Sequence, residues 1–216
     1  MRIDLHTHTI FSDGELIPSE LVRRAMYLNH SAIAITDHVD VTNVEFVVTN
    51  LVKAVELCQD YIKVIPGVEI THVPPNKIDA IAKKARKFGA QWIVVHGETV
   101  TEPVMPGTNL ASAQNPEIDI LAHPGFITLE EAQIAKDNDV ILEITGRMGH
   151  NITNGHVANM AREVGAKMVI DSDTHAPENL MDEKAAWTVA LGAGLTREEA
   201  EKAINVTPFE AIQHLY

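Results

Sequence analysis

Short apolar segments alternate with amphipathic segments along most of the chain. The apolar segments are rich in Val, Ile and Ala and are nearly uninterrupted, which is typical of parallel strands covered on both faces. The intervening segments have the apolar spacing of helices. We predict seven strands, at residues 2–6, 31–36, 62–69, 91–96, 118–123, 140–145 and 167–171. Strand–helix units of roughly 25 to 30 residues predict either a closed parallel barrel or an open, doubly wound sheet.

Local signals mark several helix ends. Pro18 suits the first turn of a helix, where its missing N–H is not needed. Gly89 and Gly165 follow helical segments directly before strands, where a left-handed C-terminal cap is expected. A Thr followed three residues later by a Glu is the pattern of a capping box, and it occurs at residues 128–131, 196–199 and 207–210. Residues 97–115 contain several Pro and Gly residues, and we expect a long irregular loop there.

Composition and charge narrow the class of protein. A chain of 216 residues with 45% hydrophobic residues can bury a sizeable core, and we expect a single domain that covers residues 1–216. The net charge of −13 disfavours a broad contact with long nucleic acid, which requires a basic face. Cys58 is the only cysteine, so neither an internal disulfide nor a Cys-based zinc site is possible. Without a signal-peptide pattern or a membrane-length apolar run, we expect a cytoplasmic protein with no membrane partner.

Histidine and carboxylate residues gather at the ends of the predicted strands. Residues 4–8 have the sequence Asp-Leu-His-Thr-His and residues 171–175 have Asp-Ser-Asp-Thr-His, so ligand-type residues take every second position in both. In a strand, alternate side chains point to the same face. Four more strand ends carry such residues, namely His38, Glu69, His96 and His123. The C-terminal ends of strands meet on one rim in a closed barrel but not in an open sheet, so the pattern favours a barrel with a metal cluster.

The motifs DLHTHT at 4–9, SDG at 12–14, ITDH at 35–38, GVE at 67–69, AHPG at 122–125 and DSDTH at 171–175 resemble those of the PHP (polymerase and histidinol phosphatase) family. This resemblance implies a distorted TIM-like (β/α)7 barrel with three bound metal ions and the cleavage of phosphate esters. It also implies a division of ligands: His6, His8, Glu69 and Asp173 for one ion, Glu69 with His96 and His123 for a second, and Asp13, His38 and His175 for the third.

The chemistry of these side chains agrees with that implication. Imidazole nitrogen and carboxylate oxygen suit zinc, manganese or iron. Three divalent ions and three carboxylates leave a local charge of about +3, which suits a phosphate monoester dianion in an otherwise acidic protein. A metal-bound hydroxide would be the nucleophile, and we assign no separate catalytic residue.

Further polar residues lie at or near the same rim. Arg147 follows the sixth strand and is a candidate for phosphate binding, and His150 is a candidate donor to the leaving oxygen. Asp4 and Asp171 are expected either to orient a ligand histidine or to be buried, hydrogen-bonded acids. Two weaker candidates for substrate contact are Glu98 and His72. We expect structural roles for His30, His156 and His214.

We therefore expect a metal-dependent phosphoesterase acting on a small phosphate monoester, with histidinol phosphate as one possibility. An exonuclease or phosphatase acting on short oligonucleotides or nucleotide bisphosphates would use the same metals. An amidohydrolase is disfavoured, because no lysine follows a strand where such enzymes often form a bridging carbamate. A non-catalytic RNA-binding subunit, as in ribonuclease P, is disfavoured by the acidic charge and by the retained ligands.

Overall fold

The computed structural model describes residues 2–58 and 60–215. Parallel strands form a curved sheet in the order β1-β2-β4-β5-β6-β7-β8, with the short β3 pairing with β4 beyond the end of β2. The strands are β1 (Arg2–Asp4), β2 (His30–Ile35), β3 (His38–Val39), β4 (Lys63–Ile70), β5 (Trp92–His96), β6 (Ile120–Ala122), β7 (Ile141–Thr145) and β8 (Met168–Asp171). Because β3 prolongs the line of β2, the sheet has seven strand positions. This confirms the predicted α/β, TIM-like barrel.

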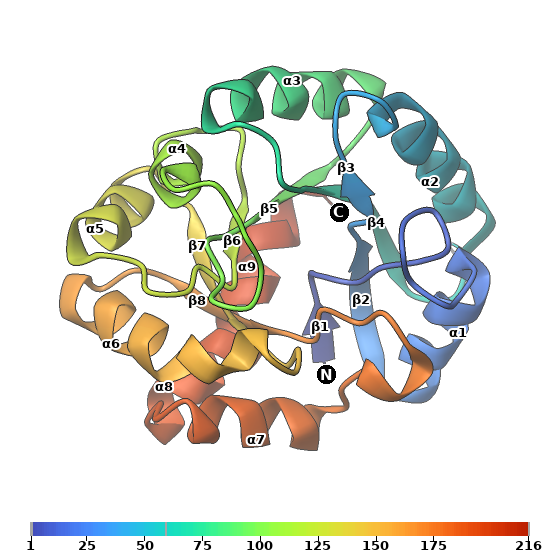
Figure 1. Ribbon diagram of the computed structural model, residues 1–216. Coiled ribbons are helices and arrows are strands. Elements are labelled where there is room, and N and C mark those ends of the chain that lie inside the picture. Colours follow the sequence, from blue (N-terminus) through green and yellow to red (C-terminus); the bar gives the residue numbers. More distant parts are fainter. Residues whose placement is uncertain (1, 59, 216) are drawn as a thin grey trace.

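Helices surround this sheet, except for α9, which lies behind the centre of the barrel in Figure 1. They are α1 (Pro18–Tyr27), α2 (Val44–Cys58), α3 (Ile78–Phe88), α4 (Thr108–Ala113), α5 (Leu129–Asp137), α6 (Asn154–Val164), α7 (Glu183–Gly192), α8 (Arg197–Glu201) and α9 (Thr207–Ile212). A π-helical turn (Lys202–Val206) joins α8 to α9. Cys58 is buried at the end of α2 in the apolar layer, as its sequence context predicts. Within the described ranges, no helix has both the length and the apolar character needed to cross a bilayer.

The barrel closes beyond the ends of its first and last strands. Thr7 and Thr174 form an isolated parallel bridge. The His8 backbone N–H donates to the Thr174 carbonyl at 2.8 Å, and the Asp173 N–H donates to the His6 carbonyl at 3.0 Å. The two ligand-rich segments at opposite ends of the chain therefore lie side by side at one rim.

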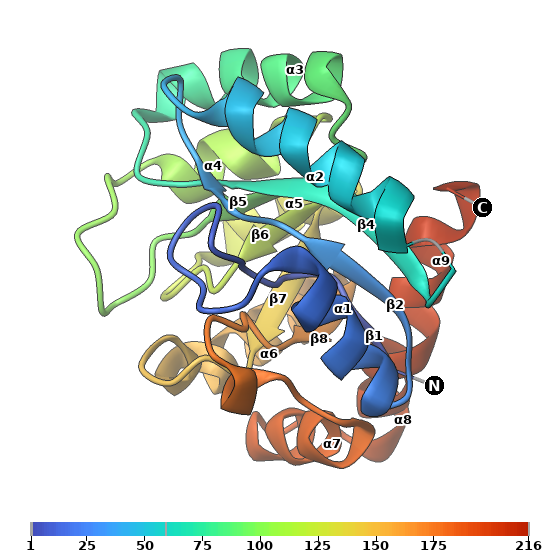
Figure 2. The same cartoon turned by 90° about the vertical axis from the view of Figure 1, so that its right-hand side faces the viewer.

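Two apolar layers hold this architecture. One fills the space between the strands and the helices, and the other fills the barrel interior. The interior layer includes Ile3, Leu5, Ile65, Trp92 and Val169. Ile212 of α9 belongs to the same layer, at the N-terminal end of the barrel. Burying each such large side chain stabilises the fold by about 1.5–3 kcal/mol. Figure 2 shows α9 at the right, on the opposite side of the barrel from the long loops that follow the strands.

The helix ends agree in part with the sequence signals. α1 begins at Pro18, and α5 and α8 begin with complete capping boxes at Thr128 and Thr196. Gly89 and Gly165 adopt left-handed caps with φ of 113° and 73°. The capping box predicted at Thr207 is wrong, since no side chain caps α9. The preceding π-helical turn is continuous with α9, so Thr207 does not begin a helix after a non-helical residue.

Two predicted strands are shorter in the structure by more than one residue. The first ends at Asp4, because the Leu5 N–H donates to the Asp171 carboxylate at 2.8 Å instead of to a neighbouring strand. The strand predicted at 118–123 is limited to Ile120–Ala122, because His123 adopts a positive φ of 29°. Simple strand alternation thus does not explain how His6 and His8 reach the rim, since both lie in the loop after β1.

The expectation of an irregular segment at 97–115 is wrong in part, because α4 lies within it. One Glu98 carboxylate oxygen accepts hydrogen bonds from the N–H groups of Gly107 and Asn109, both at 2.9 Å. This side chain therefore satisfies backbone donors at the start of α4. Glu98 therefore has a structural role through this oxygen, and its contact with a substrate stays a prediction.

Candidate metal centre

The structure brings all nine predicted ligand residues together at the C-terminal rim of the barrel. They come from six chain segments: His6, His8 and Asp13 from the loop after β1, His38 from β3, Glu69 from β4, His96 from β5, His123 from the turn after β6, and Asp173 and His175 from the loop after β8. Asp13 is the most exposed of them, whereas His6, His8, Glu69, His96, His123 and Asp173 are buried.

The first group contains His6, His8 and Glu69, and Asp173 lies beside it in a further group with His6 and His123. The Nε2 atoms of His6 and His8 are 3.0 Å apart. His6 Nε2 lies 3.3 Å from Glu69 Oε2, and His8 Nε2 lies 3.2 Å from Asp173 Oδ1. Atoms that bind one ion at about 2.0–2.2 Å lie about 3 Å apart or slightly more. These separations therefore fit a shared cation.

The second group joins Glu69 to His96 and His123, whose ligand atoms all lie within 4.8 Å of one another. Glu69 Oε1 lies 3.5 Å from His123 Nε2, while Oε2 faces His6. The two oxygens of Glu69 thus point toward different histidines. This orientation fits a carboxylate that bridges two ions.

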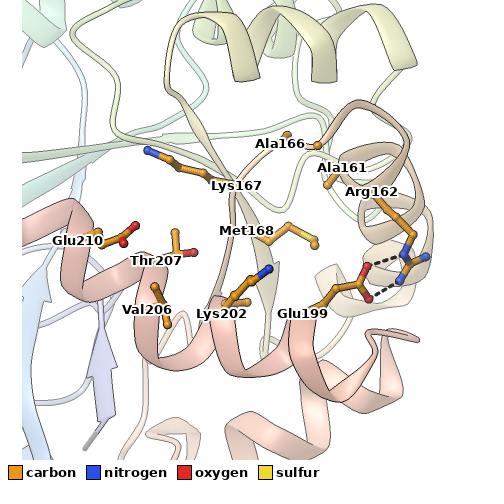
Figure 3. Close-up of a pocket in the computed structure, with 12 residues that line it drawn as sticks. Ala161, Arg162, Ala166, Lys167, Met168, Glu199, Lys202, Val206, Thr207 and Glu210 are labelled. Atoms are coloured by element: carbon orange, nitrogen blue, oxygen red, sulfur yellow. Dashed lines mark hydrogen bonds and ion pairs between the residues drawn. The ribbon is translucent and has the colours of Figure 1, made fainter.

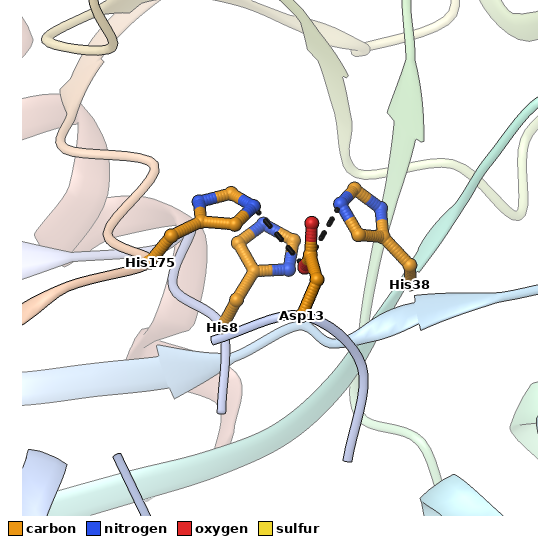
Figure 4. Close-up of side chains that lie close together, drawn as sticks. All are labelled: His8, Asp13, His38 and His175. Carbon is orange, nitrogen blue, oxygen red and sulfur yellow. Dashed lines mark ion pairs between the residues drawn. The ribbon is translucent and has the colours of Figure 1, made fainter. Parts of the chain in front are cut away.

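The third group contains Asp13, His38 and His175, and His8 also lies beside it (Figure 4). Asp13 Oδ1 is 3.2 Å from His175 Nε2 and 3.5 Å from His38 Nε2. The His8 ring lies 4.1 Å from the His175 ring and 4.3 Å from the His38 ring, centroid to centroid. This group faces solvent more than the other two, through the half-exposed Asp13.

Several buried polar atoms of this cluster have no hydrogen-bond partner among the described residues. Both carboxylate oxygens of Glu69 and Oδ1 of Asp173 are buried and have no hydrogen bond. Burial disfavours the charged form of Glu69, but the positive charges of His6 and His38 hold its pKa well below its usual range. Burial and the neighbouring His38 lower the pKa of His8 to about 3, so His8 offers a neutral nitrogen at neutral pH. Buried carboxylates that face imidazole nitrogens, among them the neutral His8, fit the donor set of divalent transition-metal ions.

Glu143 of β7 belongs to this centre, although the sequence analysis did not identify it. Its Oε1 atom lies 2.6 Å from His6 Nδ1, and its Oε2 atom accepts a hydrogen bond from the His123 N–H at 2.9 Å. The side chain thereby orients the His6 ring and the turn that carries His123. The sequence does contain one indication of this role, because Glu143 is the single acid in the otherwise apolar strand sequence Ile-Leu-Glu-Ile-Thr.

Asp4 and Asp171 lie one layer deeper than the ligands. Asp4 pairs with Arg2 at 3.2 Å and accepts a hydrogen bond from the Ser172 N–H at 3.2 Å. Asp171 accepts from the Leu5 N–H, and burial together with the charge of Asp4 raises its pKa. Both acids therefore hold the backbone of the two His- and Asp-rich segments, while Glu143 contacts the His6 ring.

A second residue missed in the sequence is Glu102, in the loop before α4. One of its oxygens lies 2.8 Å from His72 Nε2 and 3.2 Å from His96 Nε2, and the other lies 3.4 Å from His150 Nε2. His150 Nδ1 is also 2.7 Å from the Thr99 hydroxyl. His72 and His150 therefore both lie at the rim, where the sequence analysis expected them. Glu102 is a single acid in a loop without a periodic pattern, so the sequence did not indicate its contacts with these histidines.

The remaining candidates are placed as follows. Arg147 is half-buried in the loop after β7, on the same rim. His30 and His156 face backbone carbonyls of Ala25 and Ile127 at 3.0 Å and 2.7 Å, which agrees with structural roles.

A cavity of about 470 Å³ lies at the other end of the barrel, beside the π-helical turn (Figure 3). Met168 and Ala203 line it, and an ion pair between Arg162 and Glu199 at 2.6 Å borders it. None of the nine clustered residues lines this cavity. It is therefore separate from the candidate metal centre.

Comparisons with known proteins agree with this geometry. The PHP domain model matches residues 4–133. The chain is 54% identical to an uncharacterized protein of Methanocaldococcus jannaschii, over 100% of both chains. It is 27% identical to Ribonuclease P protein component 3 of Methanosarcina barkeri, over 95% of this chain and 86% of the relative.

Among solved structures, the histidinol phosphate phosphatase of Lactococcus lactis, complexed with zinc, L-histidinol and phosphate, has a similar fold. The TM-score is 0.64 at 16% identity, and the match covers 90% of this chain and 94% of the other. The matched domain model, the barrel and the cluster of ligand-type residues lead to one conclusion. This chain belongs to the PHP domain family.

Proposed function

We propose that this protein is a metal-dependent phosphoesterase that hydrolyses a phosphate monoester at the C-terminal rim of the barrel. The observation that carries the proposal is the convergence of nine imidazole and carboxylate side chains, with buried carboxylate oxygens that lack hydrogen-bond partners. Membership of the PHP family supports hydrolytic chemistry. The zinc and phosphate named for the Lactococcus lactis structure support the same class of reaction.

The three groups described above would hold three divalent ions, either zinc, manganese or iron. Such ions polarise phosphoryl oxygens and lower the pKa of a water molecule. Glu143 would keep the coordinating nitrogen of His6 aimed at the cluster, because the opposite ring nitrogen is fixed at 2.6 Å from its carboxylate.

The protein's own residues would also position the substrate. Arg147 is the proposed phosphate contact, since a guanidinium can donate two parallel hydrogen bonds to phosphate oxygens. Burial and the neighbouring His123 lower the pKa of His150 to about 4, so its ring is neutral at neutral pH. His150 would therefore act on the leaving oxygen as a neutral hydrogen-bond donor. In a chain with a net charge of −13, the local cations would select a small anion.

A substrate panel tests the proposal. Metal-free protein should be inactive, and loading with zinc, manganese or iron should give turnover of at least one phosphate monoester, histidinol phosphate included. A Glu69→Gln variant loaded in the same way is the control for contaminating phosphatases. Absence of turnover for every ester with all three metals would contradict the proposal.

A second candidate is suggested by the relative named Ribonuclease P protein component 3. In that case the protein would bind structured RNA as a subunit of a larger assembly. The net charge of −13 disfavours this function, because RNA binding depends on basic surface. Gel shifts with ribonuclease P RNA at physiological salt would decide, with Methanosarcina barkeri component 3 as the positive control.

A further inference from the structure

Another group of ligand-type residues lies at the rim, outside the groups assigned above to three ions. This outer group contains His72 from the loop after β4, His96 from the end of β5 and Glu102 from the loop between β5 and α4. Figure 2 shows this last loop at the left, where it extends beyond the strand ends. Neither His72 nor Glu102 is among the nine clustered residues.

The distances within the outer group fit a single cation. Glu102 Oε2 lies 2.8 Å from His72 Nε2 and 3.2 Å from His96 Nε2. Atoms that bind one ion at about 2.0–2.2 Å lie about 3 Å apart or slightly more. The other Glu102 oxygen lies 3.4 Å from His150 Nε2, so the carboxylate is held with Oε2 toward His72 and His96.

His96 belongs both to the outer group and to the second group described above. Its Nδ1 atom faces the Gly97 carbonyl at 3.2 Å, which leaves Nε2 as the nitrogen available to an ion. A neutral imidazole has one free nitrogen lone pair and therefore binds one ion at a time. An ion bound to His96 thus has two alternative positions, one in the second group and one in the outer group.

The two positions differ in their exposure to solvent. The side chains of Glu69 and His123 are each 1% exposed, whereas those of His72 and Glu102 are 37% and 40% exposed. Taking an ion out of water is costly unless protein ligands replace the water. The outer group offers such ligands at the surface, on the solvent side of the buried second group.

The backbone at His72 indicates that this side chain is held in place for a purpose. Its φ of 53° lies in the left-handed region, which is unfavourable for a residue other than glycine. His123 and Asp173, both in the cluster, also have a positive φ. Such unfavourable conformations gather at functional sites. His72 therefore resembles the cluster residues in its backbone as well as in its side chain.

We propose that the outer group is a metal-exchange site through which a divalent transition-metal ion enters and leaves the second group. The ion from solution first binds His72 and Glu102, and then His96 Nε2. It keeps its bond to His96 while Glu69 and His123 replace the two outer ligands. Water molecules on the ion are displaced as ligands bind, and release follows the same steps in reverse. This inference rests on the metal binding in the proposed function, but not on phosphatase activity.

The test measures zinc exchange without any phosphate ester. An excess of a chromophoric chelator gives the release rates of the zinc-loaded protein, and stopped-flow mixing with a zinc-loaded fluorescent indicator gives the uptake rates of the metal-free protein. Competition with the chelator gives the affinities. The variants are Glu102→Gln and His72→Gln. The control is Glu130→Gln, which removes the same charge from the exposed start of α5. Thermal melting checks that each variant is folded.

We expect the release and uptake rates of one ion per chain to fall together in Glu102→Gln, each by about tenfold or more, because a charged ligand is lost from the path. His72→Gln should show a smaller fall in both rates. The dissociation constant should change by less than about threefold in either variant, because it is the ratio of two rates that fall by the same factor. The control variant should exchange zinc as the wild type does.

Unchanged release and uptake rates in both variants would overturn the inference. A weaker affinity that arises from faster release alone would also overturn it, because Glu102 would then be a permanent ligand of the second ion. If zinc exchanges as expected but no phosphate ester is hydrolysed, the proposed function is contradicted and the exchange site is supported.

Discussion

The two ends of the barrel are built from the same strands but differ in what their side chains do. At the N-terminal end, Ile3, Trp92 and Ile212 close the interior with apolar contacts. At the C-terminal end, Glu69 and Asp173 are buried with carboxylate oxygens that have no hydrogen-bond partner. Burying a charge without a partner opposes folding, whereas burying apolar surface favours it. The comparison shows that the N-terminal end stabilises the fold through apolar burial, whereas the rim gathers buried charged groups, a composition that fits a cation site.

The largest effect is expected at the rim, from Glu69→Gln. Glu69 faces both the first and the second group, so its loss should weaken the binding of two ions at once. We expect kcat/KM to fall by more than the 10- to 100-fold typical of residues outside the coordination shell. Metal content and phosphatase activity measure this, and a variant with normal metal content would place the bridging ligand elsewhere.

The corresponding test at the N-terminal end of the barrel is the substitution Ile212→Ala. Ile212 is fully buried in the interior layer, so its truncation should destabilise the protein by about 2–5 kcal/mol. Denaturant unfolding measures the loss, and metal analysis of the folded variant should find the same number of ions as in the wild type. A loss of bound metal without a loss of stability would remove the distinction between the two ends.

Glu143→Gln tests the contact between the Glu143 carboxylate and the His6 ring. The amide keeps the size of the side chain but provides a weaker acceptor for His6 Nδ1. We expect the affinity for one ion to fall about 10- to 100-fold, as for other partners of metal-binding histidines. Competition with a chromophoric chelator gives the affinity. An unchanged value would mean that Glu143 only anchors the His123 backbone.

The smallest predicted effect concerns pH and His30 at the start of β2. Burial lowers the pKa of His30 to about 4, from the ordinary value of 6.5. Between these two values the unfolded chain binds more protons than the folded protein, so His30 makes the fold less stable as the pH falls from 6.5 to 4. At pH 5 this destabilisation is about 2 kcal/mol.

His30→Gln removes this proton uptake and keeps a donor for the Ala25 carbonyl. Between pH 7 and pH 5 the wild type should therefore lose about 2 kcal/mol more than the variant, measured by denaturant unfolding at both values. Equal losses of unfolding free energy in the two proteins would show that His30 does not contribute to the acid sensitivity and that other titrating groups cause it.

The nearly continuous apolar runs predicted parallel strands, and the ligand-type residues after nearly every strand favoured a barrel and predicted which imidazole and carboxylate side chains gather at its rim. It did not predict how His6, His8 and Asp173 reach the rim. These residues lie beyond the strand ends, and Asp173 adopts a positive φ of 51° that its sequence does not indicate.

The missed residues share a physical reason. Glu143 contacts His6 across 137 positions of sequence, and Glu102 contacts His150 from an exposed loop. Both contacts depend on where separate segments meet in space, and neither segment has a periodic pattern that reveals its partner. The capping box predicted at Thr207 failed for another reason, because the preceding helical turn runs on into α9 and leaves no helix start to cap.

Anomalous diffraction at the zinc absorption edge, from crystals of zinc-reconstituted protein, tests the central claim most directly. The proposed centre predicts three peaks at the rim, with Glu69 bonded to two of the ions and Asp13, His38 and His175 bonded to the third. Crystals without a peak within bonding distance of Glu69, or with zinc held only by other residues, would contradict it.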